Sequence, residues 1–356
     1  MVLITVESLS AEYLTHFGNK QNLTPQLNKL AKESLLFTNL YATGTRTVRG
    51  LEALTLSIPP TPGRSIVKRP DNEGVFSIGY IFRDHGYDTR FIYGGYGYFD
   101  NMSYFFENNG FDIVDRTYHE DAEIEFANIW GISDEDLFHR SLLEMDKSYK
   151  QGKPFFNLIM TTSNHRPFTY PEGRIDIPSH SGREGGVKYT DYAIGQFIEQ
   201  ARQKSWFNNT IFVIVADHCA SSAGEAELQF NKYKIPLIIY APAYIKPQII
   251  DTLSSQIDVA PTIPGLLNFS YDSKFFGHDM LRQQKNQARA LIGNYQKLGY
   301  LTNDRLTILS PLNGINTYQV DYTNGNAKKI APVQTDIDEA ITYYQSANLV
   351  LTKKLN

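Results

Sequence analysis

The amino-acid sequence predicts an α/β fold, with a doubly wound, mostly parallel sheet flanked by helices and a small C-terminal antiparallel β extension. Short apolar runs rich in β-branched residues alternate with longer segments in which apolar residues recur every three or four positions. Polar residues repeatedly follow the short runs, as they do where parallel strands end at the ligand-binding edge of an open sheet. With 356 residues, 42% of them hydrophobic, the chain is long enough to bury a sizeable core.

The order of the expected elements supports this fold. The first run, Val-Leu-Ile-Thr-Val at 2–6, is typical of a strand buried on both faces. A helix is expected to begin at Pro25, because Thr24 and the proline form a typical first turn. Further strands are predicted at 35–40, 88–93, 111–114, 155–160, 210–216 and 235–240. Further helices are predicted at 48–58, 75–85, 102–108, 134–149, 187–203 and 257–267.

The sequence pattern changes after residue 285. Short apolar runs at 290–292, 298–301 and 306–309 predict antiparallel strands on the edge of the sheet, followed by a helix at 336–350. We therefore expect a main domain at 1–285 and a β/α extension at 286–356 that packs on the same domain.

Composition excludes several classes of protein. The formal net charge of −4 gives no global basic field, so we expect no nucleic-acid partner and only local recognition of anions. The one cysteine, Cys219, rules out an internal disulfide framework. No run of about 18 apolar residues, the length needed to cross a bilayer, is present. Because the chain enters its first strand directly after Met1, we expect that preceding segments are missing from it.

A loop of small residues at 42–47 joins a predicted strand to a predicted helix. It places the hydroxyl of Thr47, two arginines and backbone N–H groups at the start of that helix, where a phosphate or sulfate can bind. The alternative is that Thr47 is a plain N-cap, as threonine before a helix often is.

Three further polar residues stand at predicted strand ends. Glu7 follows the first strand, and Asp217 and His218 follow the strand at 210–216. Together with the Thr47 oxygen they form a hard, mostly oxygen ligand set that suits Mn²⁺, Mg²⁺ or Zn²⁺. Such an ion would lower the pKa of the Thr47 hydroxyl and hold a phosphoryl oxygen. The alternative for Glu7 is an ordinary turn or capping carboxylate.

Several motifs, in order along the chain, carry a resemblance to a known family. They are Val-Glu-Ser-Leu at 6–9, Ala-Thr-Gly-Thr-Arg-Thr-Val-Arg-Gly at 42–50, Phe-Asp-Asn-Met at 99–102, Trp-Gly-Ile-Ser-Asp at 130–134, Thr-Ser-Asn-His-Arg-Pro-Phe at 162–168, Ala-Asp-His at 216–218 and Gln-Ile-Asp-Val-Ala-Pro-Thr at 256–262. Over residues 2–280 the chain resembles the sulfatase-like branch of the alkaline phosphatase superfamily. Within it, the chain is most similar to the phosphoglycerol transferases, which include lipoteichoic acid synthase and the periplasmic glucan phosphoglycerol transferase.

The resemblance implies roles for individual residues. Thr47 would be the nucleophile that takes up phosphoglycerol. Glu7, Thr47, Asp217 and His218 would bind one divalent ion, which is manganese in the lipoteichoic acid enzymes. His165 lies in the substrate-binding motif, where it would contact a phosphate oxygen or the leaving group; a histidine without this motif would more often be structural.

Three further residues near the motifs have candidate roles. Arg46 and Arg49 flank the nucleophile and would offset negative charge that develops in the reaction; the alternative is that they pair with nearby acids. The lipoteichoic acid enzymes have a tryptophan and an arginine just before the motif at 99–102, and both are missing here. Tyr98 would stack in the tryptophan's place, unless it is a packing residue, and we interpret Trp130 as a core residue.

The predicted function is transfer of a phosphoglycerol group from a phosphatidylglycerol-like lipid to a hydroxyl of a glycan or a polyglycerolphosphate, through a covalent phospho-Thr47. The resemblance implies the periplasmic or extracellular face of the bacterial cytoplasmic membrane, reached through the missing segments. Alternatives are a related phosphodiesterase, a sulfatase, a phosphoethanolamine transferase, or a non-catalytic paralogue that binds metal and headgroup. The segment around Thr47 lacks the Cys/Ser-x-Pro-x-Arg pattern of sulfatases, and phosphoethanolamine transferases commonly carry disulfides.

Overall fold

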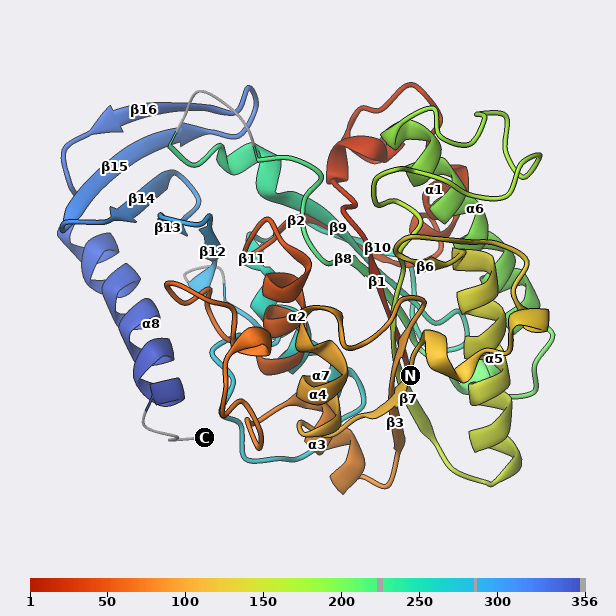
Figure 1. Cartoon of the computed structure of the whole chain (residues 1–356). Coiled ribbons are helices and arrows are strands. Elements are labelled where there is room, and N and C mark those ends of the chain that lie inside the picture. Colours follow the sequence, from red (N-terminus) through yellow and green to blue (C-terminus); the bar gives the residue numbers. More distant parts are fainter. Residues whose placement is uncertain (223–226, 285–286, 353–356) are drawn as a thin grey trace. The chain divides into compact units, whose positions relative to one another are not determined.

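The computed structural model describes residues 1–222, 227–284 and 287–352 (Figure 1). The chain divides into two compact units. Unit 1 comprises residues 1–37, 82–216 and 236–250, and unit 2 comprises residues 38–81, 217–235 and 251 onward. The predicted boundary between residues 285 and 286 lies outside the described residues, so the predicted domain division stays a prediction.

A mostly parallel sheet of nine strands is built mainly by unit 1. Its order is β10 (Gln248–Ile250), β2 (Leu35–Tyr41), β9 (Lys234–Tyr240), β8 (Phe212–Ala216), β1 (Val2–Val6), β7 (Phe155–Met160), β3 (Asp88–Tyr93) and β4 (Asp112–Val114). β11 (Ser254–Ser255) pairs with the end of β2. β1 lies between β7 and β8 and is parallel to both, and its five residues are buried. β9 runs antiparallel to β8. The predicted α/β fold with a mostly parallel sheet is confirmed.

Helices accompany this sheet in unit 1. α5 (Asp134–Lys150) and α6 (Arg183–Ala201) lie side by side (Figure 1), and α5 also packs on β7 and β3. α5 begins where the hydroxyl of Ser133 accepts a hydrogen bond from the amide of Asp136, a typical N-cap. The shorter helices of unit 1 are α1 (Pro25–Ala31) and α4 (Met102–Glu107), whereas α3 (Ile78–Asp84) contains residues of both units. Short 3₁₀ helices cover Ala11–Tyr13, Thr15–Phe17, Ile66–Lys68, Phe99–Asn101, Arg116–Tyr118, Asp121–Glu123, Phe207–Asn209, Phe230–Tyr233 and Gln256–Asp258.

A buried carboxylate of α6 caps α1 and makes stability depend on pH. Asp191 accepts hydrogen bonds from the amides of Gln26 (2.9 Å) and Leu27 (2.8 Å), and burial raises its pKa from 3.8 to about 7. Between these two values the folded state holds a proton that the unfolded state has lost. Asp191 therefore makes the free energy of unfolding fall as pH rises from 4 to 7, by up to about 4 kcal/mol.

The measurement is urea denaturation of the native protein and of Asp191→Asn at pH 4, 5.5 and 7. Asparagine cannot titrate, so the free energy of unfolding of the native protein should fall relative to that of the variant over this range. Parallel pH dependences of the two proteins would contradict the prediction.

Unit 2 contains a second, antiparallel sheet of five strands. Its order follows the chain: β12 (Ala290–Gly293), β13 (Leu298–Leu301), β14 (Arg305–Ser310), β15 (Gly314–Asp321) and β16 (Asn326–Ile330). The C-terminal helix α8 (Gln334–Thr352) packs on β13 and β14 (Figure 1). The predicted antiparallel extension is therefore confirmed, with β15 and β16 as additional strands that the sequence pattern did not resolve.

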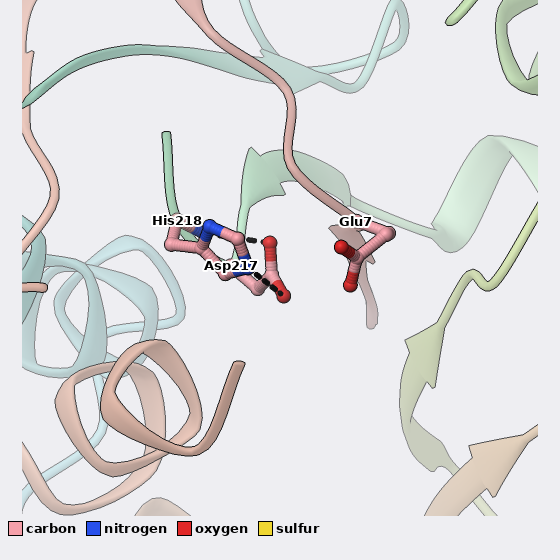
Figure 2. Close-up of side chains that lie close together, drawn as sticks. All are labelled: Glu7, Asp217 and His218. Atoms are coloured by element: carbon pink, nitrogen blue, oxygen red, sulfur yellow. Dashed lines mark hydrogen bonds and ion pairs between the residues drawn. The ribbon is translucent and has the colours of Figure 1, made fainter. Parts of the chain in front are cut away.

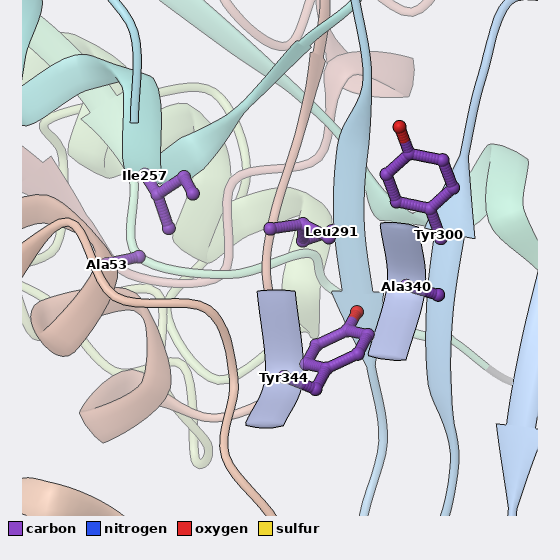
Figure 3. Packing of buried hydrophobic residues seen from close by; sticks show 6 residues of the cluster. All are labelled: Ala53, Ile257, Leu291, Tyr300, Ala340 and Tyr344. Atoms are coloured by element: carbon purple, nitrogen blue, oxygen red, sulfur yellow. The ribbon is translucent and has the colours of Figure 1, made fainter. Parts of the chain in front are cut away.

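The core of unit 2 joins this sheet to α2 (Thr47–Leu56), to α8 and to the 3₁₀ helix Gln256–Asp258, which directly precedes α7 (Val259–Leu266). Figure 3 shows the buried cluster, which consists of Ala53, Ile257, Leu291, Tyr300, Ala340 and Tyr344. The hydroxyl of Tyr344 donates to the carbonyl of Gly299 (2.8 Å), so this buried polar group is satisfied. Ala53 of this cluster belongs to α2, so the packing of the cluster holds the helix that begins at Thr47. Among the described residues, no helix combines the length and the apolar character needed to cross a membrane.

Candidate active site

Glu7 and Asp217 follow directly after two neighbouring parallel strands. Val6 of β1 pairs in register with Ala216 of β8, so the next residue of each strand leaves the sheet at the same edge. Both carboxylates are buried, Glu7 with 4% of its surface exposed and Asp217 with none. Figure 2 shows them with His218, and each of the three offers a ligand atom within 4.8 Å of the others. The structure thus brings together three of the four predicted metal ligands.

The imidazole of His218 is held in one orientation by its own loop. Nδ1 lies 2.7 Å from the carbonyl oxygen of Cys219. A carbonyl only accepts, so Nδ1 carries a proton, and Nε2 is the ring nitrogen that is left to bind a metal ion. Nε2 lies 3.5 Å from Oδ2 of Asp217, and Oδ1 of Asp217 accepts a 2.6 Å hydrogen bond from the amide of His218. The loop therefore selects the tautomer that a metal-binding histidine needs.

The end of β7 holds Glu7 in place. The Glu7 amide donates to Oγ1 of Thr161 (3.0 Å), and Nδ2 of Asn164 donates to the Glu7 carbonyl (2.8 Å). On the side chain, Oε1 accepts a 2.6 Å hydrogen bond from the hydroxyl of Ser8. Sequence reasoning assigned no role to Thr161 or Asn164, although a Thr-Ser-Asn run directly after a buried strand was the available signal.

The residues of this cluster fit a divalent ion. Two buried carboxylates close together repel each other when both are ionised, and a cation between them removes that cost. The donor set of two carboxylates and one imidazole suits Mn²⁺, Mg²⁺ or Zn²⁺. Members of the alkaline phosphatase and sulfatase superfamily use a divalent metal, which agrees with this set of ligands.

Thr47 is the first residue of α2, and its position follows from the packing of that helix. The N-cap is Arg46, with extended backbone angles, so Thr47 does not occupy the capping position that was the alternative. Thr47 and Gly50 are three residues apart and therefore lie on the same face of α2. A Cβ on Gly50 would lie 1.8 Å from the carbonyl oxygen of Asp217, so this face of the helix contacts the Asp217 backbone. The hydroxyl of Thr47 lies one turn before that contact.

Replacing Gly50 by alanine should displace this contact. No side-chain rotation relieves an overlap between Cβ and a backbone carbonyl, so α2 or the Asp217 segment must move. We expect a loss of stability of about 1–3 kcal/mol and weaker metal binding. Thermal melting and Mn²⁺ titration of Gly50→Ala, beside Gly314→Ala as a control in the same unit, measure both effects. Native-like behaviour of Gly50→Ala would refute the proposed packing.

Gln256 links the loop before α2 to Asp217, and sequence reasoning gave it no role. Its Nε2 donates to the carbonyl of Asp217 (2.7 Å), and its Oε1 accepts from the amide of Thr43 (3.0 Å). The side chain is fully buried. The amide uses its donor on one segment and its acceptor on the other, so Gln256 is a positioning residue for both segments.

The two arginines beside Thr47 differ in their surroundings. Arg49 pairs with Glu52 at 3.1 Å, the alternative considered for it, and its guanidinium also donates to the carbonyl of Gly63. Glu52 is buried, which raises the pKa of its carboxyl group. Arg46 is exposed. Catalytic or substrate-binding roles for Arg46 and Arg49 stay predictions.

His165 is partly buried and packs against Trp130, with ring centroids 3.8 Å apart and ring planes inclined at 44°. Its Nδ1 lies 3.0 Å from the carbonyl of Arg166, so Nδ1 carries a proton and Nε2 is the atom that can exchange one with a substrate. Trp130 is only partly buried, so its interpretation as a core residue is wrong: it lies in the turn between β5 (Ala127–Asn128) and β6 (Gly131–Ile132), at the surface. The side chain of Tyr98 is 78% exposed.

Asp134 anchors the segment that carries His165. Its Oδ1 accepts from the amides of Thr162 (2.9 Å) and Ser163 (3.1 Å), and its Oδ2 accepts from the hydroxyl of Thr190 (2.6 Å). Burial of the carboxyl group raises its pKa. Asp134 is the last residue of the Trp-Gly-Ile-Ser-Asp motif, so this motif helps to hold the segment that follows β7 in place.

Comparison with known proteins identifies the family. The family model described as Sulfatase matches residues 1–269, which is most of the chain. The chain belongs to the sulfatase family. A solved protein in the alkaline phosphatase superfamily from Vibrio parahaemolyticus is 36% identical, with a TM-score of 0.94 over 99% of this chain and 87% of that one. The structure of the lipoteichoic acid synthase LtaP from Listeria monocytogenes has the same fold, with 20% identity and a TM-score of 0.84 over 99% of this chain and 92% of that one.

Curated relatives of this sulfatase-family chain carry more specific names. Phosphoglycerol transferase I of Xanthomonas campestris pv. campestris is 25% identical over 79% of this chain, and lipoteichoic acid synthase 2 of Bacillus subtilis is 25% identical over 81%. The chain spans 42% and 48% of their respective lengths, less than half of each. The predicted family and the prediction of an enzyme are confirmed, whereas the roles of the individual site residues stay predictions.

Proposed function

We propose that this chain is a metal-dependent transferase that moves a phosphoglycerol group from a phosphatidylglycerol-like lipid to a hydroxyl of a glycan or a polyglycerolphosphate. The observation that carries the proposal is the cluster of Glu7, Asp217 and His218, with the α2 face that bears Thr47 packed on the Asp217 backbone. The names of the curated relatives support the choice of the transferred group.

In the proposed first step, the Thr47 oxygen attacks the phosphorus of the lipid. Thr47 reacts as its alkoxide, after its hydroxyl proton has passed to solvent. An Oγ–P bond forms, the bond from phosphorus to the diacylglycerol oxygen breaks, and the leaving oxygen takes a proton from Nε2 of the protonated His165. In the second step neutral His165 accepts the proton of the acceptor hydroxyl, and the acceptor oxygen attacks phosphorus. The Oγ–P bond breaks and Thr47 leaves as its alkoxide, so both residues return to their starting protonation states. Phosphorus therefore remains in a phosphodiester throughout, because its bond to the lipid oxygen is replaced first by one to Thr47 and then by one to the acceptor.

Glu7, Thr47, Asp217 and His218 would hold the metal ion. Manganese is the first choice for this ion, and magnesium and zinc are the alternatives. When bound, it supplies a Lewis acid that polarises a phosphoryl oxygen and lowers the pKa of the attacking hydroxyl. Arg46 and Arg49, together with the start of α2, supply positive charge near the phosphoryl group. We place this reaction at the periplasmic or extracellular face of a bacterial cytoplasmic membrane.

The test is the intact mass of the protein after incubation with Mn²⁺ and a short-chain phosphatidylglycerol. We expect a gain of one glycerophosphoryl group, mapped by peptide fragmentation to Thr47, together with release of diacylglycerol. Addition of a glycan or of glycerol should discharge the adduct onto the acceptor. If neither adduct nor diacylglycerol forms, the proposed donor is wrong; discharge to water alone would indicate a phosphodiesterase.

A further inference from the structure

A cluster of exposed aromatic rings extends from His165 across the surface of unit 1. We call Tyr96, Tyr98, Phe99 and Trp130 the aromatic platform. Tyr96, Tyr98 and Phe99 expose 43%, 78% and 45% of their surface. Tyr96 stacks on Tyr98 with ring centroids 5.6 Å apart, and Phe99 meets Trp130 edge-on at 5.6 Å. Large exposed aromatic clusters are unusual on soluble proteins and mark binding surfaces.

The backbone under the platform is held rigidly. A Cβ on Gly95 would lie 2.4 Å from the carbonyl oxygen of Trp130, and one on Gly131 would lie 2.3 Å from that of Gly94. The residue directly after β4 adds a further restraint, because the Asp115 carboxylate accepts a 2.8 Å hydrogen bond from the amide of Gly97. Since the loop is fixed before any ligand arrives, little conformational entropy is lost when the rings are covered.

The platform is continuous with the proposed reaction site. Trp130 packs against His165 with ring centroids 3.8 Å apart and ring planes inclined at 44°, and the indole N–H donates to the carbonyl of Arg166. A molecule that covers Tyr98 and Phe99 would therefore extend toward Nε2 of His165, the atom assigned to the acceptor hydroxyl. Because the platform adjoins His165, we infer that its ligand is the acceptor of the reaction.

Charge narrows the chemistry of that acceptor. The segment 94–130, which contains the whole platform, holds eight carboxylates and one arginine. Cations from other elements pair with three of these carboxylates: Arg83 with Asp112, Arg140 with Glu123, and Arg174 with Glu125. The exposed Arg166, whose carbonyl accepts from Trp130, adds one more cation. An excess of negative charge still remains, which disfavours a polyanion such as polyglycerolphosphate and an anionic bilayer, and leaves a neutral ligand unaffected.

We propose that the aromatic platform binds the sugar rings of a neutral glycan acceptor. Flat aromatic faces stack on the C–H face of a pyranose, and the tyrosine hydroxyls can hydrogen-bond to sugar hydroxyls, which an aliphatic surface cannot do. The assignment of this glycan as acceptor rests on the proposed function, whereas its binding to the platform does not. Of the two acceptors considered above, the structure favours the glycan.

The experiment is a fluorescence titration of the full chain with a neutral β-linked glucose oligosaccharide of five units. Trp130 is one of two tryptophans, and the other, Trp206, is buried with 3% exposed, so quenching reports on the platform. We expect saturable binding that Tyr98→Ala weakens at least fivefold. Tyr149→Ala, which removes a tyrosine that is 49% exposed on α5, should bind like the native protein.

An oligomer of glycerol phosphate, titrated in parallel, should bind more weakly than the oligosaccharide. Equal affinities of the native protein and Tyr98→Ala, absence of saturation, or tighter binding of the glycerol phosphate oligomer would overturn the inference. Circular dichroism checks that both variants fold. Repeating the titration with Thr47→Ala separates the two proposals, because glycan binding should persist there even if no phosphoglycerol transfer is ever found.

Discussion

Replacing Thr47 by alanine should abolish phosphoglycerol transfer, with a fall in kcat of at least about a thousandfold. The proposed reaction begins with attack by the Thr47 oxygen, and alanine has no atom that can form the bond to phosphorus. The measurement is release of diacylglycerol from phosphatidylglycerol under saturating Mn²⁺, together with the intact mass of the protein. No adduct should form on the variant.

The fold should survive this change, which makes the result interpretable. Thr47 is the first residue of α2 and is only partly buried, and alanine has the higher helix propensity. We therefore expect a melting temperature close to that of the native protein. Thr47→Ser keeps a hydroxyl and should retain a measurable part of the activity. Native turnover by Thr47→Ala would exclude a threonine nucleophile and with it the two-step reaction.

The main sheet could be predicted because its strands are buried on both faces. The predicted strands at 2–6, 88–93 and 155–160 agree with β1, β3 and β7 to the residue. The strands β15 and β16 were not predicted individually, because exposed and half-buried polar residues dominate them and leave little apolar alternation. The start of α6 was placed four residues late, since its first turn contains Gly185 and Gly186, whose small size fits close contacts with Tyr170 and Asn164.

The candidate site could be predicted where it follows strand ends, and only there. Glu7 and Asp217 lie close together because the adjacent parallel strands β1 and β8 end at the same edge of the sheet. The alternation of apolar strand-like and helix-like segments in the sequence already predicts such a parallel sheet. Gln256 and Trp130 were misjudged because their partners, Asp217 and His165, are more than thirty residues away in the chain. Local patterns contain no information about such contacts.

Replacing Asp217 by asparagine should abolish the stabilisation that Mn²⁺ gives to this protein. Asparagine preserves the size of the side chain and an oxygen that can accept from the His218 amide, a 2.6 Å hydrogen bond in this structure. It removes one of the two negative charges that would hold the ion. In the native protein, Mn²⁺ at a hundred times its Kd should stabilise the fold by about 2.7 kcal/mol, and EDTA should reverse this.

The metal-free proteins provide the sharper comparison. Without an ion, the carboxylates of Glu7 and Asp217 are buried and close together, so neutralising one relieves repulsion. Asp217→Asn should therefore melt at or above the temperature of the native protein in EDTA, yet gain nothing from Mn²⁺. Asp272→Asn, at an exposed position, should behave like the native protein in both conditions. A variant that merely damaged the fold would melt lower in EDTA, and a normal Mn²⁺ response in Asp217→Asn would remove Asp217 from the metal site.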